Sequence, residues 1–151
     1  MIQKIKELIV RHREVLLYLI FGGLTTLVDW GVSFLLYALW GEAIEKTVYL
    51  IHAANLVAWV AAVLFAFVTN RIWVFHSSRR GAWAILGELG SFAGGRVLTL
   101  LLQEGFVFLF FDLLSLNMYA VKIVAAVLVV IGNYFISKLL VFRSKKPADK
   151  E

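Results

Sequence analysis

Ionisable residues stand inside long apolar stretches of this chain at four positions: Asp29, Arg96, Glu104 and Lys122. Such a residue costs about 2.5–3.5 kcal/mol at the centre of a bilayer on insertion scales, so its presence there favours a function. The planar guanidinium of Arg96 suits a phosphate, whereas carboxylates and amides suit the hydroxyls of a sugar. These residue types therefore predict a ligand that carries both phosphate and hydroxyl groups.

A purely structural role for the same residues is the alternative. An Arg–Asp pair and a Glu–Lys pair would neutralise each other, but a buried ion pair is weak evidence for stability, so we favour function. For the asparagines, hydrogen bonding between helices stays an open alternative. Arg71 and Lys138 stand at the ends of apolar stretches, where they also suit lipid head groups. Small residues such as Gly87, Ser91 and Gly95 are assigned to close helix packing.

The elements that must position these residues are four apolar stretches, roughly Leu16–Leu39, Val48–Ile72, Gly87–Phe111 and Tyr119–Phe142. Each is long enough to cross about 30 Å of hydrocarbon as a helix. With 62% hydrophobic residues the chain is too apolar for a soluble domain. It contains no cysteine, which excludes disulfides and thiolate metal sites.

Polar residues gather on one face of each stretch when it is drawn as a helix at 100° per residue. Four such faces are expected to pack together, because lipid cannot provide hydrogen bonds to their polar groups. The prediction is an all-α polytopic membrane four-helix bundle.

The positive charges predict the orientation in the membrane. Twelve of the fifteen Lys and Arg residues lie before the first stretch, around the loop after the second, or at the end of the fourth. By the positive-inside rule, both termini and the middle loop are cytoplasmic in the cell (inner) membrane. This distribution also argues against nucleic-acid binding. Residues 1–15 are expected to begin with an amphipathic interfacial helix, residues 16–142 to form the membrane domain, and residues 143–151 to be a disordered basic tail.

An internal repeat links the second and fourth stretches at an offset of 67 residues. Tyr49–Phe75 aligns without a gap on Leu116–Phe142, and both segments end in a polar residue, a basic residue, two further residues and Val-Phe. The first and third stretches match more weakly, through Phe21-Gly22-Gly23 and Phe92-Ala93-Gly94. Since two spans return the chain to the same side, the bundle is predicted to consist of two parallel two-helix repeats.

These residues resemble the GtrA-like family of small four-span membrane proteins. The resemblance runs from about Tyr18 to Phe142 and is carried by Phe21-Gly22-Gly23 through Asp29, Asn70-Arg71-Ile72-Trp73-Val74-Phe75, Phe92 through Gly95-Arg96, and Asn133-Tyr134 followed by Lys138 and Val141-Phe142. It implies a role in cell-surface polysaccharide synthesis, either moving polyprenyl-phosphate-linked sugars across the membrane or assisting the glycosyltransferases that make or use them.

The function we predict is translocation of a polyprenyl-phosphate-linked sugar, with no chemical reaction, cofactor or metal. The expected partners are the sugar lipid, the membrane, a second copy of the chain and, as a further candidate, a glycosyltransferase. The phosphate-binding candidates are Arg96, Lys122, Arg71 and Lys138. The sugar-binding candidates are Asp29, Asn55, Gln103, Glu104 and Asn133.

Two other functions remain as alternatives. A non-transporting adaptor for a polyprenyl-phosphate glycosyltransferase needs no charge inside the membrane. A small proton-coupled multidrug exporter also uses a carboxylate in its first span, but its loops often balance their charges, whereas the charges here are strongly biased to one side.

Overall fold

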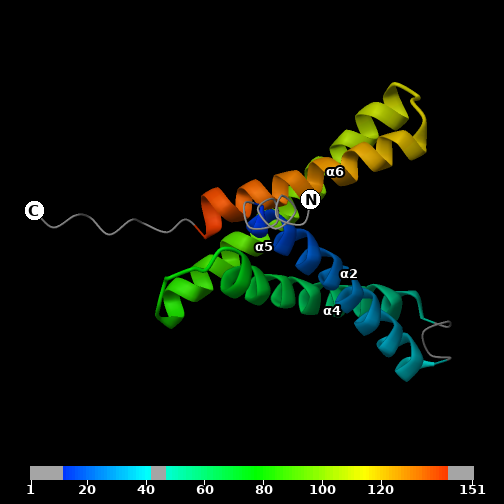
Figure 1. Cartoon of the computed structure of the whole chain (residues 1–151). Helices are drawn as coiled ribbons and strands as arrows, with labels where there is room; N and C mark the ends of the chain where they lie inside the picture. Colours follow the sequence, from blue (N-terminus) through cyan, green and yellow to red (C-terminus); the bar gives the residue numbers. More distant parts are fainter. Residues whose placement is uncertain (1–11, 42–46, 143–151) are drawn as a thin grey trace, which may run out of the picture. The chain divides into compact units, whose positions relative to one another are not determined.

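The computed structural model describes residues 12–41 and 47–142. In these ranges the chain is helical and has no strand, which confirms the all-α class (Figure 1). The helices are α2 (Arg13–Trp40), α4 (Val48–Thr69), α5 (Ala82–Val107) and α6 (Met118–Ile136). Three of them continue directly into π-helical turns: η1 (Asn70–Val74), η2 (Phe108–Leu113) and η3 (Ser137–Val141). Most of the predicted interfacial helix and the predicted tail, residues 1–11 and 143–151, lie outside the described residues.

Membrane insertion follows from the surface of these helices. Among the described residues, three helices are long and apolar enough to cross a membrane: Arg13–Trp40, Tyr49–Val74 and Tyr119–Val141. With 26 residues, or about 39 Å, α5 is also long enough, but its sequence is more polar, and its crossing stays a prediction. Large aliphatic side chains are exposed on every helix, among them Leu27, Leu64, Leu101 and Ile123. Apolar surface of this extent needs lipid around it, so the chain is an integral membrane protein.

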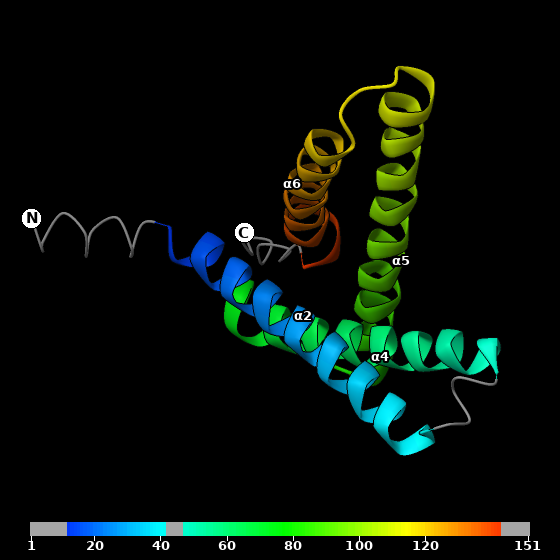
Figure 2. The same ribbon diagram turned by 90° about the vertical axis from the view of Figure 1, so that its right-hand side faces the viewer.

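The chain divides into two compact units, residues 1–76 and residues 77–151, which we call unit 1 and unit 2. Unit 1 is a hairpin in which α2 packs against α4 (Figure 2). The ring of Tyr18 lies 6.3 Å from that of Phe75, and Phe21 stacks on Trp73 at 5.6 Å. Four buried alanines follow one face of α4: Ala54, Ala58, Ala62 and Ala66. Small side chains at this spacing let helices approach each other closely.

Unit 2 is a second hairpin, formed by α5 and α6 (Figure 2). The rings of Phe92 and Phe142 lie 5.8 Å apart. Gly95 is the point of closest approach, because a Cβ built there would lie 2.6 Å from Cγ2 of Ile136. At Gly87, Gly90 and Gly94, by contrast, an added Cβ would meet no atom of the structure within 4 Å. Of the residues assigned to packing from the sequence, Gly95 is therefore the glycine on which the hairpin depends.

The two units repeat the same local structure at their ends. η1 and η3 lie 67 residues apart, and each closes with the same bond, from the amide of Phe75 to the carbonyl of Asn70 at 2.8 Å and from Phe142 to Ser137 at 2.9 Å. Asn70 and Ser137 are both buried. A π turn widens the helix by one residue, and its occurrence at both matched positions agrees with the repeat predicted from the sequence.

The first helices of the two units match in a register that the sequence did not give. Tyr18 packs on Phe75 as Phe92 packs on Phe142, which places Tyr18 and Phe92, 74 residues apart, at equivalent positions. Thr25 and Thr99 are also 74 residues apart, and both are buried. By these contacts Tyr18, rather than Phe21, corresponds to Phe92, a difference of three residues, just under one helical turn, from the match predicted from the sequence.

Replacement of Gly95 by alanine is expected to destabilise unit 2 by about 1–3 kcal/mol, because the new methyl group overlaps the β-branched side chain of Ile136, which has little rotameric freedom. The matched control Gly94→Ala adds the same methyl group without a close neighbour and should be neutral or slightly stabilising. The measurement is the thermal midpoint of helix loss in detergent. Equal midpoints for the two variants would contradict this account of the packing.

Candidate functional site

A polar contact joins the two helices of unit 2 near their middle. The Thr99 hydroxyl lies 2.9 Å from Oδ1 of Asn133 and 3.0 Å from the Arg96 carbonyl oxygen, so it donates to one of these acceptors at a time. Thr99 is buried and Asn133 is partly exposed. Gln103 follows Thr99 by one helical turn and is also partly exposed. These side chains form a polar ledge, defined here as Thr99, Gln103 and Asn133, that can offer several hydrogen bonds to hydroxyl groups.

Arg96 lies one turn before this ledge on α5. Its guanidinium carbon is 4.9 Å from the centre of the Phe92 ring, a cation–π contact. The ring gives the cation electrostatic support, and the planar guanidinium is a group whose N–H donors match the oxygens of a phosphate. The ring itself is fixed, because Phe92 is buried against Phe142.

Two cavities extend from the ledge along α5 and α6. The first has a volume of about 300 Å³ and is lined by Thr99, Leu102, Gln103, Phe106, Ala125, Leu128, Val129, Gly132 and Ile136. The second has about 200 Å³ and is lined by Phe106, Phe110, Leu116, Ala120, Val121 and Val124. Small residues on α6, namely Ala120, Ala125 and Gly132, leave this space open. Polar side chains line only the first cavity, at its Thr99 and Gln103 end.

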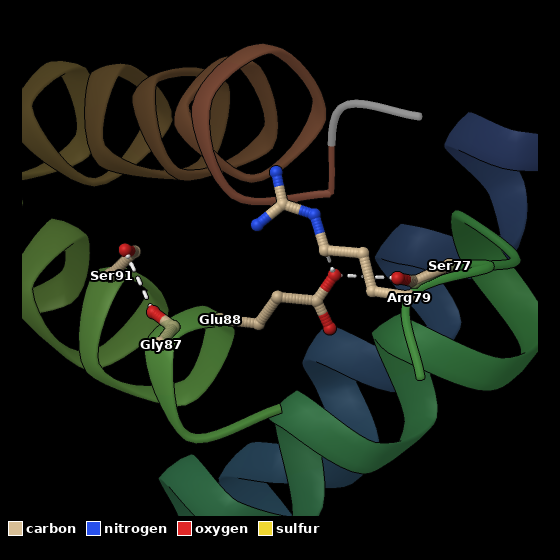
Figure 3. A network of polar contacts seen from close by, with 5 residues as sticks. All are labelled: Ser77, Arg79, Gly87, Glu88 and Ser91. Carbon is tan, nitrogen blue, oxygen red and sulfur yellow. Dashed lines mark hydrogen bonds and ion pairs between the residues drawn. The ribbon is translucent and has the colours of Figure 1, made fainter. Parts of the chain in front are cut away.

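A second polar cluster ties the loop before α5 to the first turns of that helix (Figure 3). Glu88 is only 1% exposed, and its Oε1 accepts a hydrogen bond of 2.6 Å from the Ser77 hydroxyl. Nε of Arg79 lies 3.7 Å from the same oxygen. A buried carboxylate needs both neutralisation and hydrogen bonds, and this loop supplies each. The contacts explain the burial of Glu88 without a ligand.

In unit 1, Asn55 accepts a hydrogen bond from the Tyr37 hydroxyl, and this contact joins α4 to α2. Asp29 on α2 and Arg71 in η1 are partly exposed. Asn55 therefore has a structural role whether or not it also meets a sugar.

The remaining candidates in unit 2 stand apart from the ledge. Lys122 lies 11 residues before Asn133, about 17 Å away along α6, so the structure does not bring it to the ledge. In the described part of the chain, Lys122 and Glu104 are both exposed and form no ion pair with each other. Nζ of Lys138 is 3.1 Å from the Tyr134 hydroxyl and 5.4 Å from the centre of that ring.

The site residues that sequence reasoning missed are Thr99 and Glu88. Both stood on the same predicted polar face as Arg96, and that spacing was the available signal. Their partners came from another helix and from a loop, which helical periodicity does not reveal. The described residues contain no group of three or more His, Cys, Asp or Glu side chains placed to hold a metal ion.

Comparison with known proteins identifies the family to which this chain belongs. Residues 17–142 match the family described as GtrA/DPMS, transmembrane domain. The chain therefore belongs to this family, as its sequence motifs indicated.

Its relatives include two proteins named cell wall teichoic acid glycosylation protein GtcA. The one from Listeria monocytogenes is 37% identical over 137 residues, covering 88% of this chain and 87% of that protein. The one from Listeria innocua is 36% identical over 133 residues, with the same coverage. The uncharacterized membrane protein YwcD of Bacillus subtilis is 31% identical over 130 residues, covering 86% of this chain and 97% of that protein. No solved structure matches the chain.

Loss of the Glu88 carboxylate should loosen the attachment of the loop to α5. We expect Glu88→Ala to lower the stability by about 1–3 kcal/mol, because the hydrogen bond from Ser77 and the ion pair with Arg79 both disappear. Glu88→Gln keeps an acceptor for Ser77 and should lose less. The control is Glu104→Ala, at an exposed glutamate of the same helix. Thermal unfolding in detergent gives the answer, and a Glu88→Ala midpoint equal to that of the control would refute the structural role.

Proposed function

We propose that this protein moves a polyprenyl-phosphate-linked sugar across the membrane for the glycosylation of a cell-surface polymer. The observation that carries the proposal is the combination, within one hairpin, of a guanidinium, a hydrogen-bonding ledge and apolar cavities. A sugar phosphate cannot cross hydrocarbon unaided, because each unpaired polar group costs several kcal/mol there, whereas its hydrocarbon tail can stay in lipid. The names of the GtcA relatives place those proteins in teichoic acid glycosylation, and they support a role of this kind here.

Arg96 is the residue proposed to hold the phosphate, and Gln103 and Asn133 are proposed to hold the sugar hydroxyls. Lys138, in the turn that follows α6, supplies positive charge that would attract the phosphate, and Arg71 supplies the same charge in the turn that follows α4. Asp29, Asn55 and Glu104 keep their proposed roles on other polar positions of the helices. Lys122 is not assigned to the phosphate held by Arg96, because it lies 11 residues from Asn133 along α6. No bond is made or broken in this process, so no catalytic residue is assigned.

Arg96→Ala should lower the rate of transport by about tenfold or more, since a charge-assisted hydrogen bond contributes about 1.5–3 kcal/mol. Arg96→Lys should keep part of the activity, because a point charge replaces a planar fork. The assay follows a labelled polyprenyl-phosphate sugar across proteoliposomes, with Arg80→Ala as a control at an exposed arginine.

The same assay separates transport from the adaptor function. If Arg96→Ala folds and transports like the wild type, the phosphate-holding role is excluded. If wild-type protein gives no transport and yet restores glycosylation in cells together with a transferase, the adaptor function is correct.

Orientation is tested independently of transport. Both termini and the loop around residues 77–81 are proposed to be cytoplasmic, because the positive charges concentrate there. The chain has no cysteine, so single substitutions give a clean background. In intact cells an impermeant thiol reagent should label Glu42→Cys and leave Ser78→Cys unlabelled until the cells are opened. The reverse pattern would invert the proposed topology.

A further inference from the structure

The two cavities of unit 2 lie in one line along the hairpin. Both are lined by Phe106, and together they follow α5 from Thr99 to Phe110, a length of about 17 Å. We call this feature the α5–α6 groove. A volume of about 300 Å³ for the first cavity alone is within the range of ligand sites in proteins, about 300–1,000 Å³.

The α5–α6 groove is polar at one end only. Thr99 and Gln103 line it at the end nearer to the start of α5, with Arg96 one helical turn before Thr99. The other end is lined only by apolar residues: Phe106, Phe110, Leu116, Ala120, Val121 and Val124. A ligand that matches this distribution has an anionic, hydrogen-bonding head attached to one hydrocarbon chain. The head lies towards Arg96, and the chain runs towards η2.

We propose that the α5–α6 groove binds the first isoprene units of the lipid carrier, with the phosphate at the Arg96 end. This inference rests on the proposed function and specifies how that substrate lies. The cavities form a single row between two helices, which gives room for one chain, whereas a glycerophospholipid has two. A branched chain is wider than an acyl chain, and the width is available because Ala120, Ala125 and Gly132 stand opposite the larger residues of α5. Ring faces at Phe106 and Phe110, 4.3 Å apart between centres, provide contact for its methyl branches.

The direction of the bound chain determines how the lipid carrier is oriented in the membrane. Under the proposed topology α5 begins on the cytoplasmic side, so the head of the ligand points to the cytoplasm and its chain to the outer side. This is the orientation of a lipid in the cytoplasmic leaflet. A carrier in that leaflet therefore has the orientation that the groove requires.

The test uses a polyprenyl phosphate without sugar that bears a diazirine in its isoprene units near the phosphate. It is bound to the full-length protein in proteoliposomes, cross-linked by light and mapped by mass spectrometry. We expect the label on the groove residues around Phe106 and Val124. Unlabelled polyprenyl phosphate should compete, and phosphatidic acid, which has the same head charge on two acyl chains, should compete at least about tenfold less well, a difference of about 1.4 kcal/mol.

A matched pair of variants locates the chain. Ala125 is 1% exposed and lines the groove, so Ala125→Leu fills it and should reduce labelling about tenfold, again about 1.4 kcal/mol. Ala126→Leu makes the same change at an exposed position outside the groove and should label like the wild type.

Several outcomes would overturn the inference: wild-type label confined to other helices, equal competition by phosphatidic acid, or full labelling of Ala125→Leu. The wild-type map alone decides the matter if a variant fails to fold. Groove labelling without any transport would contradict the proposed function and still support binding of the carrier in the α5–α6 groove. Transport without groove labelling would support the proposed function and contradict binding in the groove.

Discussion

Hydrocarbon offers no hydrogen bonds, and the polar side chains of this protein are arranged around that constraint. Within the described helices, the hydroxyls of Thr25, Thr69 and Ser91 each donate to the carbonyl one turn earlier in the same helix. Other polar side chains pair between neighbouring helices, Tyr37 with Asn55 in unit 1 and Thr99 with Asn133 in unit 2. Each is therefore important for the register of its hairpin, because a shifted helix would leave polar atoms unpaired in lipid.

The two repeats end in the same way and differ in the residues that precede those ends. Both close with a π turn, a buried polar residue and a ring packed on the first helix of the unit. Before these ends, buried alanines follow one face of α4 as far as Ala66, and at the matching position α6 has Asn133. The change from Ala to Asn introduces the polar ledge, and the cavities lie beside it. The matching ends close both hairpins in the same way, so this difference in polarity does not alter how the hairpins close.

The sequence was sufficient for those features that depend on hydropathy and spacing. It predicted the helices, the repeat and the polar face that carries Arg96, because each is visible within one segment. The third helix begins at Ala82 rather than Gly87, so it includes five further apolar residues, 82–86, that the predicted stretch left out. Contacts that depend on two segments were not predictable in this way. Glu88 meets Ser77 and Arg79 through a loop whose course no periodicity encodes, and the pairing of Thr99 with Asn133 follows only from the hairpin.

The physical demands of the proposed substrate agree with the unequal distribution of polarity in unit 2. A polyprenyl chain loses nothing by staying in an apolar environment, so the protein must compensate only the phosphate and the sugar hydroxyls. A guanidinium is more weakly hydrated than an ammonium, so Arg96 costs less to hold beside an apolar groove than a lysine would. The ring of Phe92 stabilises that cation, and in the proposed function a phosphate adds a stronger, charge-assisted interaction. A guanidinium positioned by a ring can therefore gain further stabilisation from an anionic ligand.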